Sequence, residues 1–193
     1  MRWRGQEGFT LPELLVVMAI LPIALITLLG ALDTTAQLAP RSVQHAGAVG
    51  EAGTGMSRAI REIRRTYRVV GTTPNSLTFL TETAGVTTQI NISCSLPSAA
   101  VGDDGTALRR CVRTSAPEGT ALPAPDAGAV LIDRVVNGTE TDPVFEYAPS
   151  AIAPTYVRML VKVPARGEGN KGSRTEPIII EDGTLLRNNA LGL

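Results

Sequence analysis

The apolar residues of this chain form one continuous early run and a periodic remainder. From Phe9 to Leu32, 24 residues contain a single ionisable side chain, Glu13. At about 1.5 Å per residue a helix of this length spans roughly 36 Å, more than the roughly 30 Å of a bilayer's hydrocarbon core. The pattern therefore predicts a membrane-spanning helix over residues 9–32.

The charges beside this run predict its orientation. Arg2 and Arg4 lie before it together with Glu7, and the first charged residue after it is Asp33. Positively charged residues beside a span tend to stay in the cytoplasm. We therefore expect the amino terminus inside the cytoplasmic membrane and the chain beyond residue 32 outside it.

Two common kinds of segment share these features, but neither accounts for Glu13. A secretory signal peptide has an apolar core of about 7 to 15 residues followed by a small-residue cleavage site, so this run is too long for one. A plain signal anchor fits the length and the flanks. A carboxylate inside an apolar helix costs about 2.5 to 3.5 kcal/mol on insertion scales, less near the interface, so Glu13 should have a partner or a function.

After Asp33 the apolar residues become periodic, which predicts an amphipathic continuation of the helix over residues 33–69. One stripe consists of Val49, Met56 and Ile63, and the adjoining stripe of Ala52, Ile60 and Tyr67. Pro40 and four glycines near it predict an irregular stretch between the two halves.

The outer side of the predicted amphipathic helix is strongly basic. Its charged residues are Arg58, Arg61, Arg64, Arg65 and Arg68, with Glu62 as the only acid among them. Such a side is a solvated face or a subunit-contact surface. Nucleic-acid binding is disfavoured, because no stacking aromatics alternate with the arginines and the whole chain has 18 basic and 18 acidic side chains.

Residues 70–193 are predicted to form a β-rich globular head. Alternating patterns predict strands over 76–83, 86–94, 108–114, 130–136, 156–163 and 178–181, with 185–187 pairing back. Ala84-Gly85 predicts a hairpin between the first two, and stretches rich in Pro and Gly at 115–128 and 164–177 predict loops. The expected fold class is α+β, with an antiparallel sheet packed on the long helix.

Cys94 and Cys111 are the only cysteines, and in an exported head they are expected to form a disulfide worth roughly 3 kcal/mol. A zinc site would need two further ligands, and the single histidine, His45, lies in the helical region. Asp103 and Asp104 lack the alternating ligand spacing of a calcium loop, so a solvated turn is the simpler interpretation. No nucleophile, phosphate-binding or triad motif is present, so we expect neither an enzyme nor a cofactor.

The residues around Glu13 carry a resemblance to a known family. The sequence Gly8-Phe9-Thr10-Leu11-Pro12-Glu13-Leu14-Leu15-Val16-Val17 resembles the leader and cleavage site of type IV pilins and type II secretion pseudopilins. The resemblance implies that a prepilin peptidase cleaves between Gly8 and Phe9 and that the new amino group of Phe9 is methylated. It also implies that Glu13 pairs with the amino terminus of a neighbouring subunit during filament assembly, where a buried carboxylate beside an ammonium is compensated only in one axial register.

The resemblance gives a domain organisation and a set of partners. Residues 1–8 would be the prepilin leader, 9–32 the transmembrane and assembly helix, 33–69 its amphipathic continuation, and 70–193 a pilin-like head. The expected function is that of a minor pilin or pseudopilin, a structural subunit of a type IV pilus or type II secretion filament. Its partners would be the peptidase, other pilin or pseudopilin subunits, an inner-membrane assembly platform and the lipid bilayer. The alternative is a membrane-anchored binding module or adhesin that does not assemble.

Overall fold

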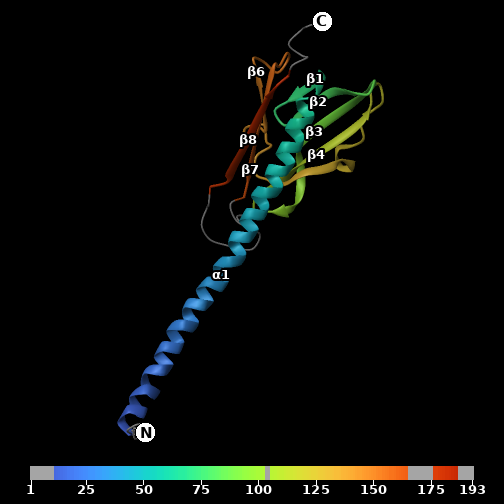
Figure 1. Ribbon diagram of the computed structural model, residues 1–193. Coiled ribbons are helices and arrows are strands. Elements are labelled where there is room, and N and C mark those ends of the chain that lie inside the picture. The colour runs from blue at the N-terminus through green and yellow to red at the C-terminus, as the bar shows by residue number, and fades with distance from the viewer. Residues whose placement is uncertain (1–10, 103–104, 165–175, 187–193) are drawn as a thin grey trace. The chain divides into compact units, whose positions relative to one another are not determined.

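The computed structural model describes residues 11–102, 105–164 and 176–186, without the side chains of residues 31–46. The chain divides into two compact units, residues 1–43 and residues 44–193, and each is considered by itself. The elements in chain order are α1 (Leu11–Ile63), β1 (Thr66–Thr73), β2 (Ser76–Thr83), β3 (Val86–Val101), β4 (Ala107–Pro117), the short 3-10 helix η1 (Pro125–Ala127), β5 (Ala129–Val135), β6 (Phe145–Ala148), β7 (Tyr156–Val163) and β8 (Ile178–Leu185). The expected α+β class is confirmed, with an apolar amino-terminal helix and antiparallel β-structure (Figure 1).

The head contains two antiparallel sheets where one was expected. Five strands form a meander in the order β1-β2-β3-β4-β5, and three form a second sheet in the order β6-β7-β8. Both sheets contribute to one core with the last turns of α1, which lie between them in Figure 1. The helix contributes Ala52, Met56, Ala59, Ile60 and Ile63, and the strands contribute mainly Ile, Val, Leu and Phe side chains. The amphipathic pattern therefore identified the buried face of the helix correctly.

The predicted end of the amphipathic helix at residue 69 is wrong. The helix ends at Ile63, where the N–H groups of Arg64 and Arg65 donate to the last carbonyls, and β1 begins at Thr66. Residues 66–73 are rich in threonine, valine and tyrosine, whose branched or aromatic side chains fit a pleated strand better than a helix. Tyr67 is accordingly 50% exposed and does not extend the buried stripe of the helix.

The expected break near Pro40 is also absent from the secondary structure, since α1 is helical from residue 11 to residue 63. An isolated glycine costs a helix only about 1 kcal/mol, and propagation from turns already formed is favourable. The larger cost, about 3 kcal/mol, comes from Pro40, and α1 nevertheless continues through this residue to turns that are anchored in the core.

The remaining strand predictions differ mainly in extent. The strands at 76–83 and 156–163 match β2 and β7. Strand β3 continues beyond residue 94 to Val101, and β8 runs unbroken from Ile178 to Leu185, so the separate pairing at 185–187 is wrong. Strand β6 was not predicted. The loop expected at 115–128 begins after β4 ends at Pro117 and contains η1, while most of the loop expected at 164–177 lies outside the described residues.

The predicted disulfide is present between Cys94 on β3 and Cys111 on β4. Both side chains are completely buried in the common core. In the chain-entropy description, a bridge that closes a loop of this size contributes roughly 3 kcal/mol by restricting the unfolded chain.

The side chain of a buried asparagine links the two sheets by hydrogen bonds. Asn137, which is 0% exposed, donates its amide hydrogens to the carbonyls of Pro143 at 3.1 Å and Leu160 at 2.8 Å. Its carbonyl accepts the N–H of Lys162 at 2.9 Å. All the hydrogens of the side-chain amide are therefore used, and the link joins the segment after β5 to strand β7.

Candidate functional site

The first described part of α1 is apolar on every side. Residues Leu11–Gly30 make up 20 helical residues, and each of their side chains is exposed in the isolated chain. This is the one helix among the described residues that is long and apolar enough to cross a membrane, with a length of about 30 Å. Burial of this surface requires a lipid bilayer or other protein chains, since the chain itself does not cover it.

Glu13 lies in the first turn of this helix, where the backbone is electropositive. The opening N–H groups of a helix have no partner within it, and an acidic side chain there interacts favourably with the helix dipole. Pro12 occupies the same turn, where the missing N–H of proline costs no helical hydrogen bond. Glu13 is exposed and is the only ionisable residue in the segment 11–30. The other residues of the segment 11–30 are apolar or uncharged, so this described stretch of the helix offers the carboxylate no counter-charge.

Several residues singled out from the sequence lie outside the described part of the structure. They are Gly8, Phe9, Asp103 and Asp104, and the side chain of His45 is likewise not described. Among the described residues, no group of three or more His, Cys, Asp or Glu side chains could hold a metal ion.

The arginines predicted for the basic side of the helix, some of which lie beyond its end at Ile63, are partly neutralised by other residues of the head. Arg113 of β4 donates to Glu62 at 2.6 Å, while Arg58 lies 4.0 Å from the other carboxylate oxygen of Glu62. Arg68 pairs with Glu118 at 3.1 Å. The Arg64 side chain also reaches strand β8, where its Nε donates to Thr184 Oγ1 at 3.4 Å. Sequence spacing could not predict these pairings, because most of the partners lie 50 or more residues away along the chain.

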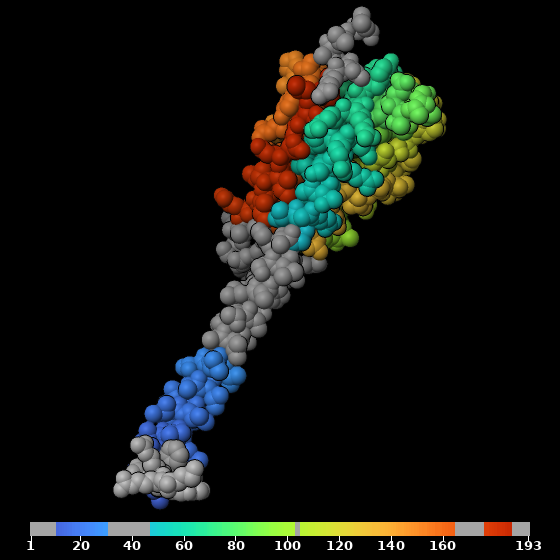
Figure 2. Space-filling model, viewed as in Figure 1, coloured from blue at the N-terminus to red at the C-terminus, as the bar shows by residue number. Residues whose placement is uncertain are grey.

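The outer face of the last turns of α1 remains open at the surface next to β8 (Figure 2). It exposes the small residues Gly50, Thr54 and Ser57 and then Arg61, and Arg65 is exposed just beyond the end of the helix. This region combines the close approach that small side chains permit with a cluster of positive charge. Both properties are compatible with the predicted subunit-contact surface.

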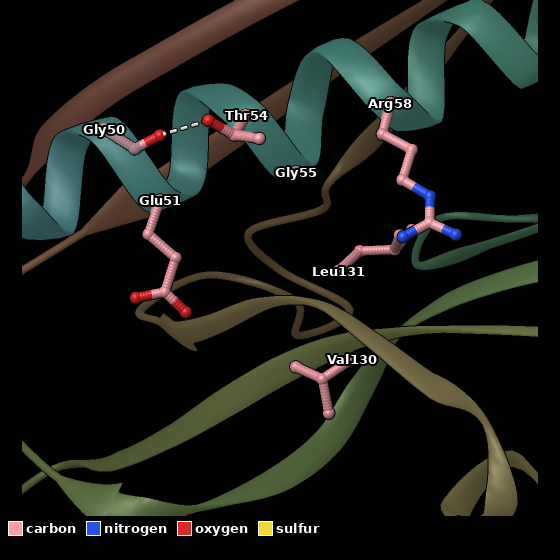
Figure 3. Close-up of a pocket in the computed structure, with 7 residues that line it drawn as sticks. All are labelled: Gly50, Glu51, Thr54, Gly55, Arg58, Val130 and Leu131. Carbon is pink, nitrogen blue, oxygen red and sulfur yellow. Dashed lines mark hydrogen bonds between the residues drawn. The ribbon is translucent and has the colours of Figure 1, made fainter.

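An open groove of about 390 Å³ runs between α1 and strand β5, and sequence reasoning missed it. Its lining residues are Gly50, Glu51, Thr54, Gly55, Arg58, Val130 and Leu131. In Figure 3, the side chains of Glu51 and Arg58 extend from the helix on either side of the groove, with Val130 between and below them. A glycine on the buried side of the helix, Gly55, was the available signal that the helix approaches another backbone closely here.

The other ionisable groups of the head form structural contacts. Burial raises the pKa of Tyr147, whose hydroxyl donates to the carbonyls of Thr73 and Ser76. On the outside of the three-stranded sheet, the hydrogen bond to Glu181 and the charges of Glu181 and Glu146 raise the pKa of Arg158. Neither group lies in the groove.

Comparison with known proteins supports the amino-terminal assignment. Residues 3–31 match the family model described as the prokaryotic N-terminal methylation motif. No curated protein sequence and no solved structure matches the chain. The match covers residues 3–8 of the expected leader, the expected cleavage site, Glu13 and most of the apolar helix, which together indicate membrane anchoring. This chain thus carries the amino-terminal leader of the type IV pilin and pseudopilin family.

Proposed function

We propose that this protein is a minor pilin or pseudopilin, a structural subunit of a type IV pilus or type II secretion filament. The observation that carries the proposal is the methylation motif at residues 3–31 together with the helical segment Leu11–Gly30, which exposes all its apolar side chains and contains the single acid Glu13. A helix of this kind needs a surrounding bilayer before assembly and surrounding helices after it.

Processing supplies the partner for Glu13. Cleavage after Gly8 by a prepilin peptidase leaves a new amino group on Phe9, which is then methylated. The ammonium of one subunit then compensates the Glu13 carboxylate of its neighbour when both lie in an apolar surrounding. Because an unpaired carboxylate costs about 2.5 to 3.5 kcal/mol in such a helix, the pairing favours one axial register over the others.

The location follows from the same segment. Before assembly the subunit spans the cytoplasmic membrane once, with its amino terminus inside and its head exported. After assembly it belongs to a periplasmic or cell-surface filament, built with other pilin or pseudopilin subunits on an inner-membrane platform. The disulfide between Cys94 and Cys111 supports export of the head, because structural disulfides persist in oxidising compartments.

Co-expression with a prepilin peptidase tests the first step. Mass spectrometry of the purified chain should show loss of residues 1–8 and methylation of Phe9. An intact amino terminus in the presence of an active peptidase contradicts the proposal and leaves a membrane-anchored binding module.

Substitution of the acid tests the second step. Glu13→Ala should still be inserted and cleaved but should fail to incorporate into filaments, because the neighbouring ammonium loses its partner. Val16→Ala, which changes an exposed apolar side chain of the same segment, is the matched control and should incorporate. Normal incorporation of Glu13→Ala, measured as its share of the sheared filament fraction, contradicts the proposed pairing.

A further inference from the structure

Strand β8 forms one edge of the three-stranded sheet and is long and regular. It contains no proline, and its pairing with β7 runs without a bulge. Figure 2 shows the strand at the surface beside the last turns of α1. Soluble proteins commonly protect an edge strand by making it short, by a bulge or by proline, so that other strands do not pair with it. Strand β8 has none of these three features.

The hydrogen bonds of β7 show which backbone groups of β8 are open. Along an antiparallel strand, successive residues direct their N–H and C=O groups to opposite neighbours. The N–H of Leu160 donates to the carbonyl of Val144 at 2.8 Å, so the even-numbered residues of β7 face β6 and the odd-numbered ones face β8. The register pairs those odd-numbered residues with the even-numbered residues of β8. The backbone groups that point away from β7 are therefore those of Ile179, Glu181, Gly183 and Leu185.

One of these edge-facing N–H groups is already occupied. The N–H of Gly183 donates to the carboxylate of Asp182 at 2.7 Å, which places this acid at the edge of the strand. Within the described part of the chain, no hydrogen bond reaches the N–H groups of Ile179, Glu181 or Leu185. The edge therefore offers unpaired backbone donors on both sides of one position that an acid covers.

The centre of this edge is acidic on both faces of the sheet. Glu181 and Asp182 are consecutive and exposed, so an added strand would meet a carboxylate on each face. Glu181 shares Arg158 with Glu146, whereas Asp182 forms no ion pair with any residue that the structure describes. Three acids therefore share one base, and an added strand has to tolerate net negative charge.

An antiparallel second copy of β8 does not fit this edge. Because only the odd-numbered residues direct their backbone groups outward, such a copy has to pair odd-numbered residues with odd-numbered ones. The two registers of this kind with the greatest overlap place Glu181 directly opposite Glu181 or Asp182 directly opposite Asp182. Like charges in directly opposite positions destabilise a strand pair. The acids thus exclude the edge strand of another copy, but they do not exclude a basic strand.

We propose that the edge of β8 binds an extended segment of another protein, in which two adjacent basic residues lie between aliphatic ones. The segment adds a fourth strand to the sheet and places one base beside Glu181 and the other beside Asp182. The second base draws the Asp182 carboxylate away and so releases the N–H of Gly183 for the new strand. Ile179 and Leu185, which are 56% and 65% exposed, offer apolar surface to the aliphatic residues at either end.

Strand β7 already shows that a base on a neighbouring strand reaches the acids of β8. Arg158 lies opposite Gly183 in the register and pairs diagonally with Glu181 on the outer face of the sheet. A base at the corresponding position of an added strand would approach Glu181 from the other side. The inference concerns the head alone, so it stands or falls independently of the leader and of filament assembly.

Hydrogen exchange of the full-length chain in detergent micelles, measured by NMR at single amides, tests the inference. The probe is a synthetic peptide of the length of β8, with Lys-Arg at its centre and alternating Val and Thr on either side. When about nine-tenths of the chain is bound, exchange at Ile179, Glu181 and Leu185 should slow about tenfold, because a paired N–H exchanges only from the free state. The matched peptide with Glu-Asp at its centre should leave these rates unchanged.

Three results overturn the inference. Equal slowing with both peptides means that the edge does not discriminate by charge. No slowing with the Lys-Arg peptide means that the edge does not add a strand. The amide of Ile180 faces β7 and serves as the internal reference. Faster exchange at Ile180 means that the peptide has displaced β7 instead of pairing with the open edge.

Charge reversal tests the role of the two acids. The chain with both Glu181→Lys and Asp182→Lys should reverse the preference and be protected by the Glu-Asp peptide alone. Glu146→Lys is the matched control, because it removes the other acid beside Arg158 and leaves the edge of β8 unchanged. This control should keep the preference of the wild type. If the doubly reversed chain does not fold, Glu181→Gln with Asp182→Asn should bind both peptides equally. A variant of either kind that still prefers the Lys-Arg peptide overturns the inference.

Discussion

Replacement of Gly55 by alanine should test how closely the helix is packed on the five-stranded sheet. The added Cβ would lie 2.1 Å from the carbonyl oxygen of Leu131 and 2.6 Å from Cγ1 of Ile132, whereas ordinary contact begins at 3.4 Å. Strand β5 would therefore have to move by about 1 Å from the helix. The nearest obstacle is backbone, which cannot rotate aside as a flexible side chain could.

Two opposing effects determine how much Gly55→Ala changes the free energy of unfolding. Alanine is favoured over glycine inside a helix by about 0.5 to 1 kcal/mol. Overpacking a close contact typically costs about 1 to 3 kcal/mol and sometimes more. Because β5 is also held by its ladder to β4, the steric cost should exceed the helical gain, and Gly55→Ala should lower the free energy of unfolding by roughly 1 to 2 kcal/mol.

The matched control is Gly53→Ala in the same helix. A Cβ on Gly53 meets nothing within 4 Å, so only the helical preference acts and stability should rise by up to about 1 kcal/mol. Urea unfolding of the full-length chain in detergent, followed by pulse proteolysis of the head, compares the two midpoints. If both variants shift in the same direction, the close approach at Gly55 does not exist as described.

Two further predictions concern buried polar groups. Asn137→Ala leaves two carbonyls and one N–H without their hydrogen-bond partner, and each such buried group costs about 1 to 3 kcal/mol. It should therefore lower the free energy of unfolding several times more than Asn91→Ala, which loses one partly buried hydrogen bond to Thr78. Equal losses of stability in urea unfolding would contradict this. For Tyr147, whose pKa is raised by burial, the unfolded chain ionises first, so its contribution is complete below about pH 10 and declines as the pH rises further. The stability difference between wild type and Tyr147→Phe should accordingly shrink above pH 10, and a constant difference would show that the hydroxyl is not buried.

The sequence predicted best the features that depend on local periodicity. The apolar run, the buried stripe through Met56 and Ile60, and strands β2 and β7 each repeat a pattern over at least eight residues. Strand β1 was missed because its alternation is broken by bulges at Tyr67 and Val70, which interrupt the pairing register with β2. Strand β6 has only four residues, too few for a period to be distinguished from chance.

The pairing of strands and side chains that lie far apart in the chain has no periodic signal in the sequence. The separation of eight strands into two sheets depends on which edges pair, and a period of two is the same in either sheet. The ion pair between Arg113 and Glu62 joins residues 51 positions apart, and each was interpretable alone as a solvated charge. The disulfide, between residues 17 positions apart, could be predicted because two cysteines allow a single pairing.

The candidate site also contains both kinds of feature, those that follow from a continuous stretch of sequence and those that depend on long-range contacts. The methylation motif and the apolar span could be identified from the sequence because each is a continuous stretch of chain. The groove is assembled from the helix and from Val130 and Leu131, some 70 residues later, so no linear pattern describes it. Apolar burial is non-directional and anchors many partners equally well, whereas placed charges discriminate between them. Substitutions at Glu51 and Arg58 should therefore leave membrane anchoring intact, because neither residue belongs to the apolar segment Leu11–Gly30.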